Sequence, residues 1–212
     1  TGGRNLLRGS STGTGWVYNR FSDLTFERDA TTNATYLQNS DARITLYSGQ
    51  SVTISFEHKE TSNYKTANAN LYLLGGTAPV YKTYAKSESW KKEVITFTLP
   101  SDWGTELSPI TNAYIRFDNN GSSDGTVATI YVRNVMLEIA TKASGSYLIP
   151  VEDTQEKITA AQNAANTAIS NFNNIVSDSI LDPSEKQAAK REWTAVQAEY
   201  TKNYAQAVSY GV

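Results

Sequence analysis

The side chains of this sequence that could do chemistry are mainly aromatic and polar ones. The chain has no cysteine and a single histidine, His58, which excludes disulfides, thiolate metal sites, cysteine nucleophiles and histidine-rich metal sites. Tyrosine and tryptophan are abundant, with 13 Tyr and 4 Trp against 6 Phe. Aromatic rings that carry a polar group are typical of hydrated binding surfaces. The composition therefore favours a protein with a ligand-binding surface.

Recognisable catalytic motifs are missing. The sequence contains no Gly-x-Ser-x-Gly elbow, no P-loop and no His-Glu-x-x-His. One pair of carboxylates, Glu57 and Asp118, is permitted by strand alternation to share a face, as the two carboxylates of a glycosidase must. Carboxylates on an exposed sheet face are usually only solvated. We therefore predict no catalytic residue, and a glycan-cleaving enzyme remains a third alternative.

Alternating strands would position the candidate binding residues. When the apolar residues of three segments face a core, the intervening residues face the other side of the sheet. The apolar sets are Val52, Ile54 and Phe56; Leu71 and Leu73; and Ala113, Ile115 and Phe117. The outward set then contains Glu57, Tyr72, Tyr114, Arg116 and Asp118. We predict a single polar face that carries these residues.

The remaining pattern up to Pro150 predicts about eight short strands. Residues 43–47 and 51–57 alternate on either side of Ser48-Gly49-Gln50, which predicts a hairpin. The last strand changes parity near Arg133 and Asn134, which indicates a β-bulge. Short strands without a helical period favour an antiparallel β-sandwich. We predict a mainly β fold, a jelly roll over residues 1–150.

Residues 151–212 have a different period. Apolar and small residues recur every three or four positions, namely Ile158, Ala161, Ala165, Ala168, Phe172 and Ile175, and then Ala189, Trp193, Val196, Tyr200, Asn203 and Ala207. Asp182-Pro183-Ser184-Glu185 is a helix start with a capping box. We predict helices at about 153–176 and 183–210, which form either an α-helical hairpin or a coiled-coil stalk. A seam rich in alanine buries little area, so a homo-oligomer through these helices is a further expectation.

Charge and hydropathy limit the partners. The chain has 19 Lys+Arg and 21 Asp+Glu, a net charge of −2, which argues against nucleic acid binding. No apolar run approaches the roughly 20 residues of a membrane span, so no membrane partner is expected. The sequence begins without methionine and ends on a helical pattern, so we expect a fragment of a longer chain.

Several segments together resemble a known family. They are Asn5-Leu6-Leu7, a Trp after a glycine-rich loop, the strand Trp90 to Pro100 and the strand Ile130 to Glu138. In this order they resemble jelly-roll carbohydrate-binding modules of the family four and nine type. The continuation through Lys142-Ala143-Ser144 to Asp153, and Leu181-Asp182-Pro183-Ser184-Glu185-Lys186, resemble tail or baseplate proteins of bacteriophages that infect Gram-positive bacteria.

The resemblance implies a non-catalytic module that helps the virion tail adhere to host cell-wall polysaccharide, with other tail or baseplate proteins as partners. Flat rings would stack on sugars and fixed polar groups would bond the hydroxyls. The candidate ligand-binding residues are Trp16, Glu57, Tyr72, Tyr114, Arg116, Asp118 and Asn119. No cofactor and no dedicated metal site are predicted, although the run Asp118 to Asp124 could hold a structural Ca²⁺. The alternative is a structural spacer of a tail fibre that binds no sugar.

Overall fold

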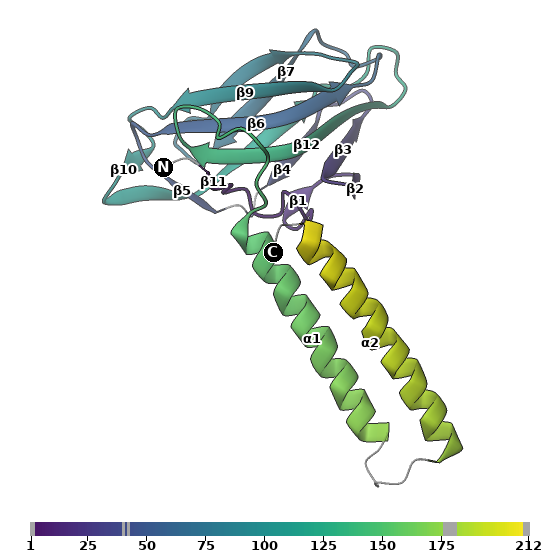
Figure 1. Ribbon diagram of the computed structural model, residues 1–212. Helices are drawn as coiled ribbons and strands as arrows, with labels where there is room; N and C mark the ends of the chain where they lie inside the picture. The colour runs from purple at the N-terminus through teal and green to yellow at the C-terminus, as the bar shows by residue number, and fades with distance from the viewer. Residues whose placement is uncertain (1–2, 40, 42, 176–181, 210–212) are drawn as a thin grey trace. The chain divides into compact units, whose positions relative to one another are not determined.

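The computed structural model describes residues 3–39, 41, 43–175 and 182–209. Within them the chain forms twelve strands followed by two helices (Figure 1). The strands are β1 (Trp16–Val17), β2 (Arg20–Ser22), β3 (Thr25–Ala30), β4 (Thr35–Asn39), β5 (Ile44–Leu46), β6 (Ser51–Glu60), β7 (Asn68–Leu74), β8 (Val80–Ala85), β9 (Lys91–Thr98), β10 (Gly104–Thr105), β11 (Ser108–Asn119) and β12 (Ala128–Ile139). The helices are α1 (Val151–Ile175) and α2 (Pro183–Ser209).

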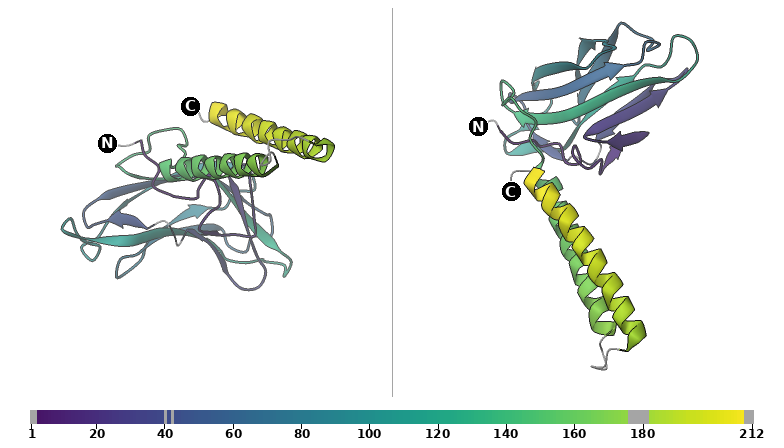
Figure 2. Two further views of the ribbon diagram at one scale, coloured as in Figure 1. Left: turned by 90° about the horizontal axis from the view of Figure 1, so that it is seen from below. Right: turned by 45° about the vertical axis from the view of Figure 1, so that its right-hand side comes forward.

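The strands form two antiparallel sheets. The seven-stranded sheet has the order β1-β4-β11-β7-β8, with β5 and β10 also paired to β11. The five-stranded sheet has the order β2-β3-β12-β6-β9, and the two layers can be followed in Figure 2. The prediction of a mainly β antiparallel sandwich followed by two helices is confirmed, with more strands in the described residues than the eight expected.

The predicted hairpin around Ser48-Gly49-Gln50 is wrong. Strand β5 pairs with β11 in one sheet, whereas β6 pairs with β9 and β12 in the other. The turn therefore carries the chain from one sheet to the other. Alternation identifies the residues that face the core, and it does so for strands of either sheet, but it does not identify the neighbouring strand.

The core lies between the sheets, and the predicted parity is correct. Side chains at the inward positions of β6, β7, β11 and β12 are buried, among them Val52, Ile54, Phe56, Leu71, Leu73, Ala113, Ile115, Phe117, Ile130, Val132, Val135 and Leu137. His58 is also fully buried, and its Nδ1 lies 2.8 Å from Oε1 of Glu60. The bulge in β12 is confirmed, because its register shifts between Arg133 and Met136 and Asn134 has φ of 53°.

The chain that follows β12 crosses the outer face of the five-stranded sheet (Figure 1). Thr53 Oγ1 donates to the carbonyl of Ala140, and Lys92 Nζ donates to the carbonyl of Gly145. Further along, the carbonyl of Leu148 accepts from the Asn5 side chain. These bonds hold residues 140–150, which we call the crossing segment, against the sheet. For this reason Thr53 is buried although it points away from the core.

The chain divides into two compact units, Thr1–Asp153 and Thr154–Val212. The first helical turn of α1 belongs to the first unit because the buried carboxylate of Asp153 accepts hydrogen bonds from the backbone of Gly9 and Ser11 and from the Ser11 hydroxyl. The boundary thus falls just after Asp153. An unpaired buried N–H is costly, so this carboxylate ties the N-terminal loop to the start of the helix.

The two helices are continuous over their described lengths (Figure 2). The capping box is confirmed: Asp182 Oδ1 accepts from the N–H groups of Ser184 and Glu185, and Glu185 Oε2 accepts from the Asp182 N–H. The predicted last residues, 176 and 210, lie outside the described residues. Neither described helix is long and apolar enough to cross a membrane.

Candidate functional site

Four side chains from four adjacent strands form a row on the outer face of the seven-stranded sheet. The Arg116 guanidinium lies 4.2 Å from the ring centroid of Tyr36 and 4.4 Å from that of Tyr72. The rings of Tyr72 and Tyr81 are stacked, with centroids 5.0 Å apart and 28° between planes. Because neighbouring strands lie roughly 4.8 Å apart, one such group per strand produces a continuous row. We call Tyr36, Arg116, Tyr72 and Tyr81 the aromatic ladder.

The pairing register of the strands explains why these four side chains are neighbours. Arg116 pairs directly with Tyr72 across β11 and β7, and Tyr72 pairs with Tyr81 across β7 and β8. Tyr36 pairs with Asp118, and it therefore lies diagonal to Arg116. Leu37, Leu71 and Phe117 on the same strands are fully buried. The apolar alternation that builds the core thus directs the ladder residues away from it.

The ends of the ladder are its accessible part. Tyr36 is 41% exposed and Tyr81 is 57% exposed. Tyr72 lies between Arg116 and Tyr81, so a neighbour covers each of its two faces. A planar ligand can therefore stack on the outer faces of Tyr36 and Tyr81, while the middle of the ladder presents ring edges, phenol hydroxyls and the guanidinium.

Asp118 fixes the guanidinium at the centre. Its Oδ1 accepts from Arg116 Nε at 2.8 Å, and its Oδ2 accepts from Nη2 at 3.4 Å. Burial raises the pKa of the Asp118 carboxyl, although the hydrogen bond and charge of Arg116 act in the opposite direction. Asp118 therefore orients Arg116 at a cost in desolvation.

The predicted site residues are only partly brought together. Tyr72, Tyr114, Arg116 and Asp118 lie on the outer face of the seven-stranded sheet, as expected. Glu57 lies on β6 and on the outer face of the five-stranded sheet. The expected single face is therefore wrong for Glu57, because strands of different sheets can share one pattern. For the same reason Glu57 and Asp118 cannot act on one glycosidic bond.

The expectation that Trp16 presents its ring to a ligand is also wrong. Trp16 is 7% exposed, and its ring stacks on Phe26 with centroids 4.4 Å apart. Its indole N–H donates to the carbonyl of Arg8. A glycine-rich loop precedes Trp16, but the Trp16 ring is buried in the core.

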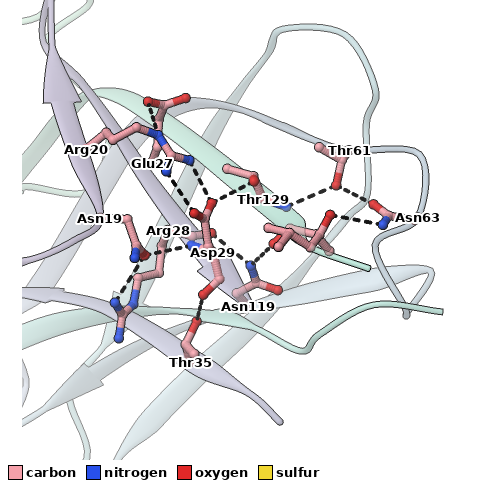
Figure 3. A network of polar contacts seen from close by, with 12 residues as sticks. Asn19, Arg20, Glu27, Arg28, Asp29, Thr35, Thr61, Asn63, Asn119 and Thr129 are labelled. Atoms are coloured by element: carbon pink, nitrogen blue, oxygen red, sulfur yellow. Dashed lines mark hydrogen bonds and ion pairs between the residues drawn. The ribbon is translucent and has the colours of Figure 1, made fainter. Parts of the chain in front are cut away.

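Asn119 is a structural residue rather than a ligand-binding one. It is fully buried, its amide donates to the carbonyls of Arg28 and Ala128, and its Oδ1 accepts from the Gly121 N–H. Figure 3 shows its amide within a polar network that joins β3, β12 and the loop at Asn63. Because backbone groups satisfy this side chain, the prediction of ligand contact is wrong.

The sequence pattern does not single out Tyr36 and Tyr81 as site residues. Alternation around the buried Leu37 could have placed Tyr36 on an outer face, since Thr35–Asn39 is a short but regular strand. Tyr81 had a weaker signal, because only Tyr84 is buried in the polar strand β8. Neither pattern shows that β4 and β8 lie on either side of β11 and β7.

The outer face of the five-stranded sheet carries a different cluster. Glu57 accepts from Arg133 Nε at 3.3 Å, from Arg133 Nη2 at 3.1 Å and from the Asn134 amide at 2.6 Å. Its pKa is lowered, first by the Arg133 hydrogen bond. The Arg133 guanidinium also lies 4.0 Å from the Trp90 ring, and Lys59 lies over both Trp90 and Tyr131. This cluster is dominated by fixed charges.

The acidic run Asp118 to Asp124 begins as the end of β11 and continues into the loop that follows Asn119. Asp124 Oδ1 accepts from the Ser122 and Thr126 hydroxyls, and the Asn63 amide donates to it. These bonds hold the pKa of Asp124 well below its usual range. Over the described ranges, no group of three or more His, Cys, Asp or Glu side chains is arranged to hold a metal. The Asp124 carboxylate is instead bonded by the side chains of Ser122, Thr126 and Asn63.

Comparison with known proteins shows that this chain is similar to several solved structures. No family model and no curated protein matches the sequence. A CBM4 structure matches with a TM-score of 0.47 and 13% identity, covering 61% of this chain and 97% of that one. The N-terminal cellulose-binding domain of Cellulomonas fimi β-1,4-glucanase C matches with a TM-score of 0.40 and 15% identity, covering 61% and 82%.

A cyclase from Fischerella sp. TAU, in complex with an indolyl butanone, also matches, with a TM-score of 0.38 and 14% identity over 58% of this chain and 68% of that one. Carbohydrate-binding modules and a cyclase thus match with similar scores. Likenesses of this size do not select a function.

Proposed function

We propose that this chain is a non-catalytic carbohydrate-binding module with jelly-roll connectivity, and that the aromatic ladder is its binding surface. The observation that carries the proposal is the row of Tyr36, Arg116, Tyr72 and Tyr81 across four adjacent strands, with exposed rings at both ends. Sugar rings present C–H groups to aromatic faces and hydroxyls to polar groups. The ladder offers both in one line across the sheet.

The ladder fits a neutral, extended ligand. The charge of Arg116 is paired with Asp118, so the surface has no uncompensated charge at its centre. The contacts repeat once per strand, and a polymer lying across the strands meets them in succession. Each contact is weak, but several along one polymer act together.

Titration of the protein with host cell-wall polysaccharide, followed by calorimetry, tests the proposal. Wild-type protein should bind, and Tyr81→Ala should bind about two- to tenfold more weakly, because a lost aromatic contact is worth roughly 0.5–1.5 kcal/mol. Val94→Ala is the matched control, since Val94 is 50% exposed on β9 of the other sheet. Absence of binding by well-folded wild-type protein, or equal affinity of the two variants, would contradict the proposal.

A structural spacer that binds no sugar is the second candidate. The observation that favours it is the coverage of Tyr72 on both faces, which leaves the middle of the ladder satisfied by its own neighbours. The double variant Tyr72→Ala/Arg116→Ala separates the candidates. Unchanged virion adsorption with a retained fold supports the spacer, whereas lost adsorption supports the binding module.

We further propose that the module belongs to a tail or baseplate protein of a phage of Gram-positive bacteria and acts on the virion, outside the host cell. The support is the resemblance of Lys142 to Asp153 and of Leu181 to Lys186 to such proteins. Antibody labelling of virions tests this placement. Label at the tail tip is the expected result, and label absent from intact virions would contradict it.

The two helices supply a candidate surface for self-association. Ile169, Phe172, Trp193 and Tyr200 are 59%, 45%, 62% and 69% exposed. A groove of about 520 Å³ between α1 and α2 is lined by small and apolar residues such as Ala165, Ala168 and Val196. A second copy of these helices could cover both. Light scattering should show a multimer that disappears when residues after Asp153 are deleted, and a monomer before deletion would contradict this.

A further inference from the structure

A small pocket lies on the outer face of the five-stranded sheet, beneath the crossing segment. Its volume is about 150 Å³. The lining includes Ser55, Glu57, Lys92, Asn134, Ser146 and Tyr147. It belongs to the sheet opposite the aromatic ladder, and no residue of the ladder lines it.

The polar groups of the pocket are held in place before any ligand arrives. Arg133 and Asn134 both donate to the Glu57 carboxylate, which fixes its orientation. Lys92 donates to the carbonyl of Gly145, which fixes the ammonium beside the crossing segment. Fixed groups bind with a smaller loss of conformational entropy. The bulge at Asn134, with φ of 53°, places its amide at the pocket wall.

The volume limits the ligand to one small unit. The pocket has a volume of about 150 Å³. Pockets for drug-sized ligands have roughly 300–1,000 Å³. The pocket therefore fits a single ring or a chain end, whereas the ladder can follow a chain over four strands.

The pocket carries charges of both signs, which suits a neutral ligand that both donates and accepts hydrogen bonds. The Glu57 carboxylate, which is paired with Arg133, and the Lys92 ammonium both line it. The carboxylate would repel an anion, and the two cationic side chains would repel a cation. A group with neighbouring hydroxyls can donate to Glu57 and accept from Lys92 and Asn134 at the same time.

From this geometry we propose that the pocket is a second binding site, which takes one neutral, hydroxyl-rich unit of the size of a single sugar residue. Tyr147 and the wall at Ser146 would limit the orientation of the unit. The site is independent of the ladder, so it stands whether or not the ladder binds a polymer. One chain with both sites would bind the interior of a glycan on one face and a single unit on the other.

Nuclear magnetic resonance titration of the full-length ¹⁵N-labelled protein with glucose, galactose and N-acetylglucosamine tests this proposal. At least one of these sugars should shift the amide signals of Gly145 and Ser146 and the side-chain amide of Asn134, with saturation in the millimolar range. Glucuronate and glucosamine, which carry a negative and a positive charge, should bind more weakly than the matching neutral sugar.

Variants test whether these amide shifts arise from binding in the pocket. Ser146→Trp should abolish these shifts, because Ser146 is an exposed residue of the crossing segment and a large side chain there fills the pocket. Glu57→Gln keeps the shape and should weaken binding severalfold. Tyr36→Ala/Tyr81→Ala, on the other sheet, should leave the shifts unchanged.

No shift with any neutral sugar, stronger binding of a charged sugar, or shifts that survive Ser146→Trp would each overturn the proposal. If wild-type protein fails to bind polysaccharide but still shows these shifts, only the proposal for the ladder is contradicted.

Discussion

The two outer faces of the sandwich carry similar residues in different surroundings. The seven-stranded sheet exposes Tyr36 and Tyr81 at the ends of an aromatic ladder, with an arginine at its centre. The five-stranded sheet also places an arginine against an aromatic ring, Arg133 on Trp90, but the crossing segment covers part of that face. One face thus presents a row of side chains across four strands, and the other forms a small pocket.

Each face contains an arginine–carboxylate pair, and burial separates them. The Asp118 side chain is 9% exposed, and burial raises its pKa despite Arg116. The Glu57 side chain is 27% exposed, and Arg133 lowers its pKa. The pKa of the carboxyl therefore shifts in opposite directions in the two pairs, because burial outweighs the arginine at Asp118 and the arginine outweighs burial at Glu57. Counting ion pairs does not reveal this difference.

The largest expected difference between the faces is the cost of removing each arginine. Arg116→Ala leaves Asp118 nearly buried without its partner, and should lower the free energy of unfolding by about 2 kcal/mol. Arg133→Ala leaves Glu57 more exposed and still bonded to Asn134, and should cost about 1 kcal/mol. Urea unfolding followed by the fluorescence of the buried Trp16 and Trp103 measures both. Equal costs, or the reverse order, would show that burial does not separate the pairs.

The pH dependence of stability should differ in sign between the faces. On the five-stranded sheet, the Arg20 hydrogen bond lowers the pKa of Asp29, a pair visible in Figure 3. This carboxylate stabilises the fold above the unfolded-state pKa, and the contribution is lost as pH falls through the folded-state pKa. The raised pKa of Asp118 has the opposite effect. Its ionisation costs stability as pH rises through the folded-state pKa.

Urea midpoints measured from pH 2 to pH 7, roughly the range in which carboxylates titrate, test these signs. The midpoint of Asp29→Asn relative to wild type should fall as pH rises, because wild type alone gains the ion pair. The midpoint of Asp118→Asn relative to wild type should rise with pH, because only wild type has a carboxyl here, and ionising that buried carboxyl costs stability. Parallel curves for the two variants would contradict the assignment.

The smallest expected effect concerns exposed side chains on the two faces. Tyr81→Ala and Val94→Ala should each change the free energy of unfolding by no more than about 0.5 kcal/mol, since both residues lie at the surface. Their binding should differ as described above. A large stability loss for Tyr81→Ala would show that the end of the ladder is a structural element, and would favour the spacer.

Alternation made much of the fold predictable. The buried set around Phe56, Leu71 and Phe117 and the bulge near Asn134 follow from residue parity within single strands. The helix start at Asp182 follows from local capping. Such features depend on interactions between residues that lie close together in the sequence, so the local sequence pattern predicts them.

The candidate site was only partly predictable. Tyr72, Arg116 and Asp118 were placed on one face by their parity with buried neighbours. Trp16 was misjudged because a glycine-rich loop permits both an exposed and a buried ring, and contact with Phe26 decides between them. Asn119 was misjudged because its partners lie on distant strands.

Local sequence patterns are enough to predict which side chains point toward the core, where strands give way to helices, and where the second helix starts, since alternation, helical period and capping act between nearby residues. Which strands are neighbours depends on the folded chain as a whole. The tertiary structure joined Tyr36 and Tyr81 to Arg116 and Tyr72, and it moved Glu57 to the opposite face. Strand pairing depends on the packing of the whole chain, because every alternating strand presents the same apolar face to any partner.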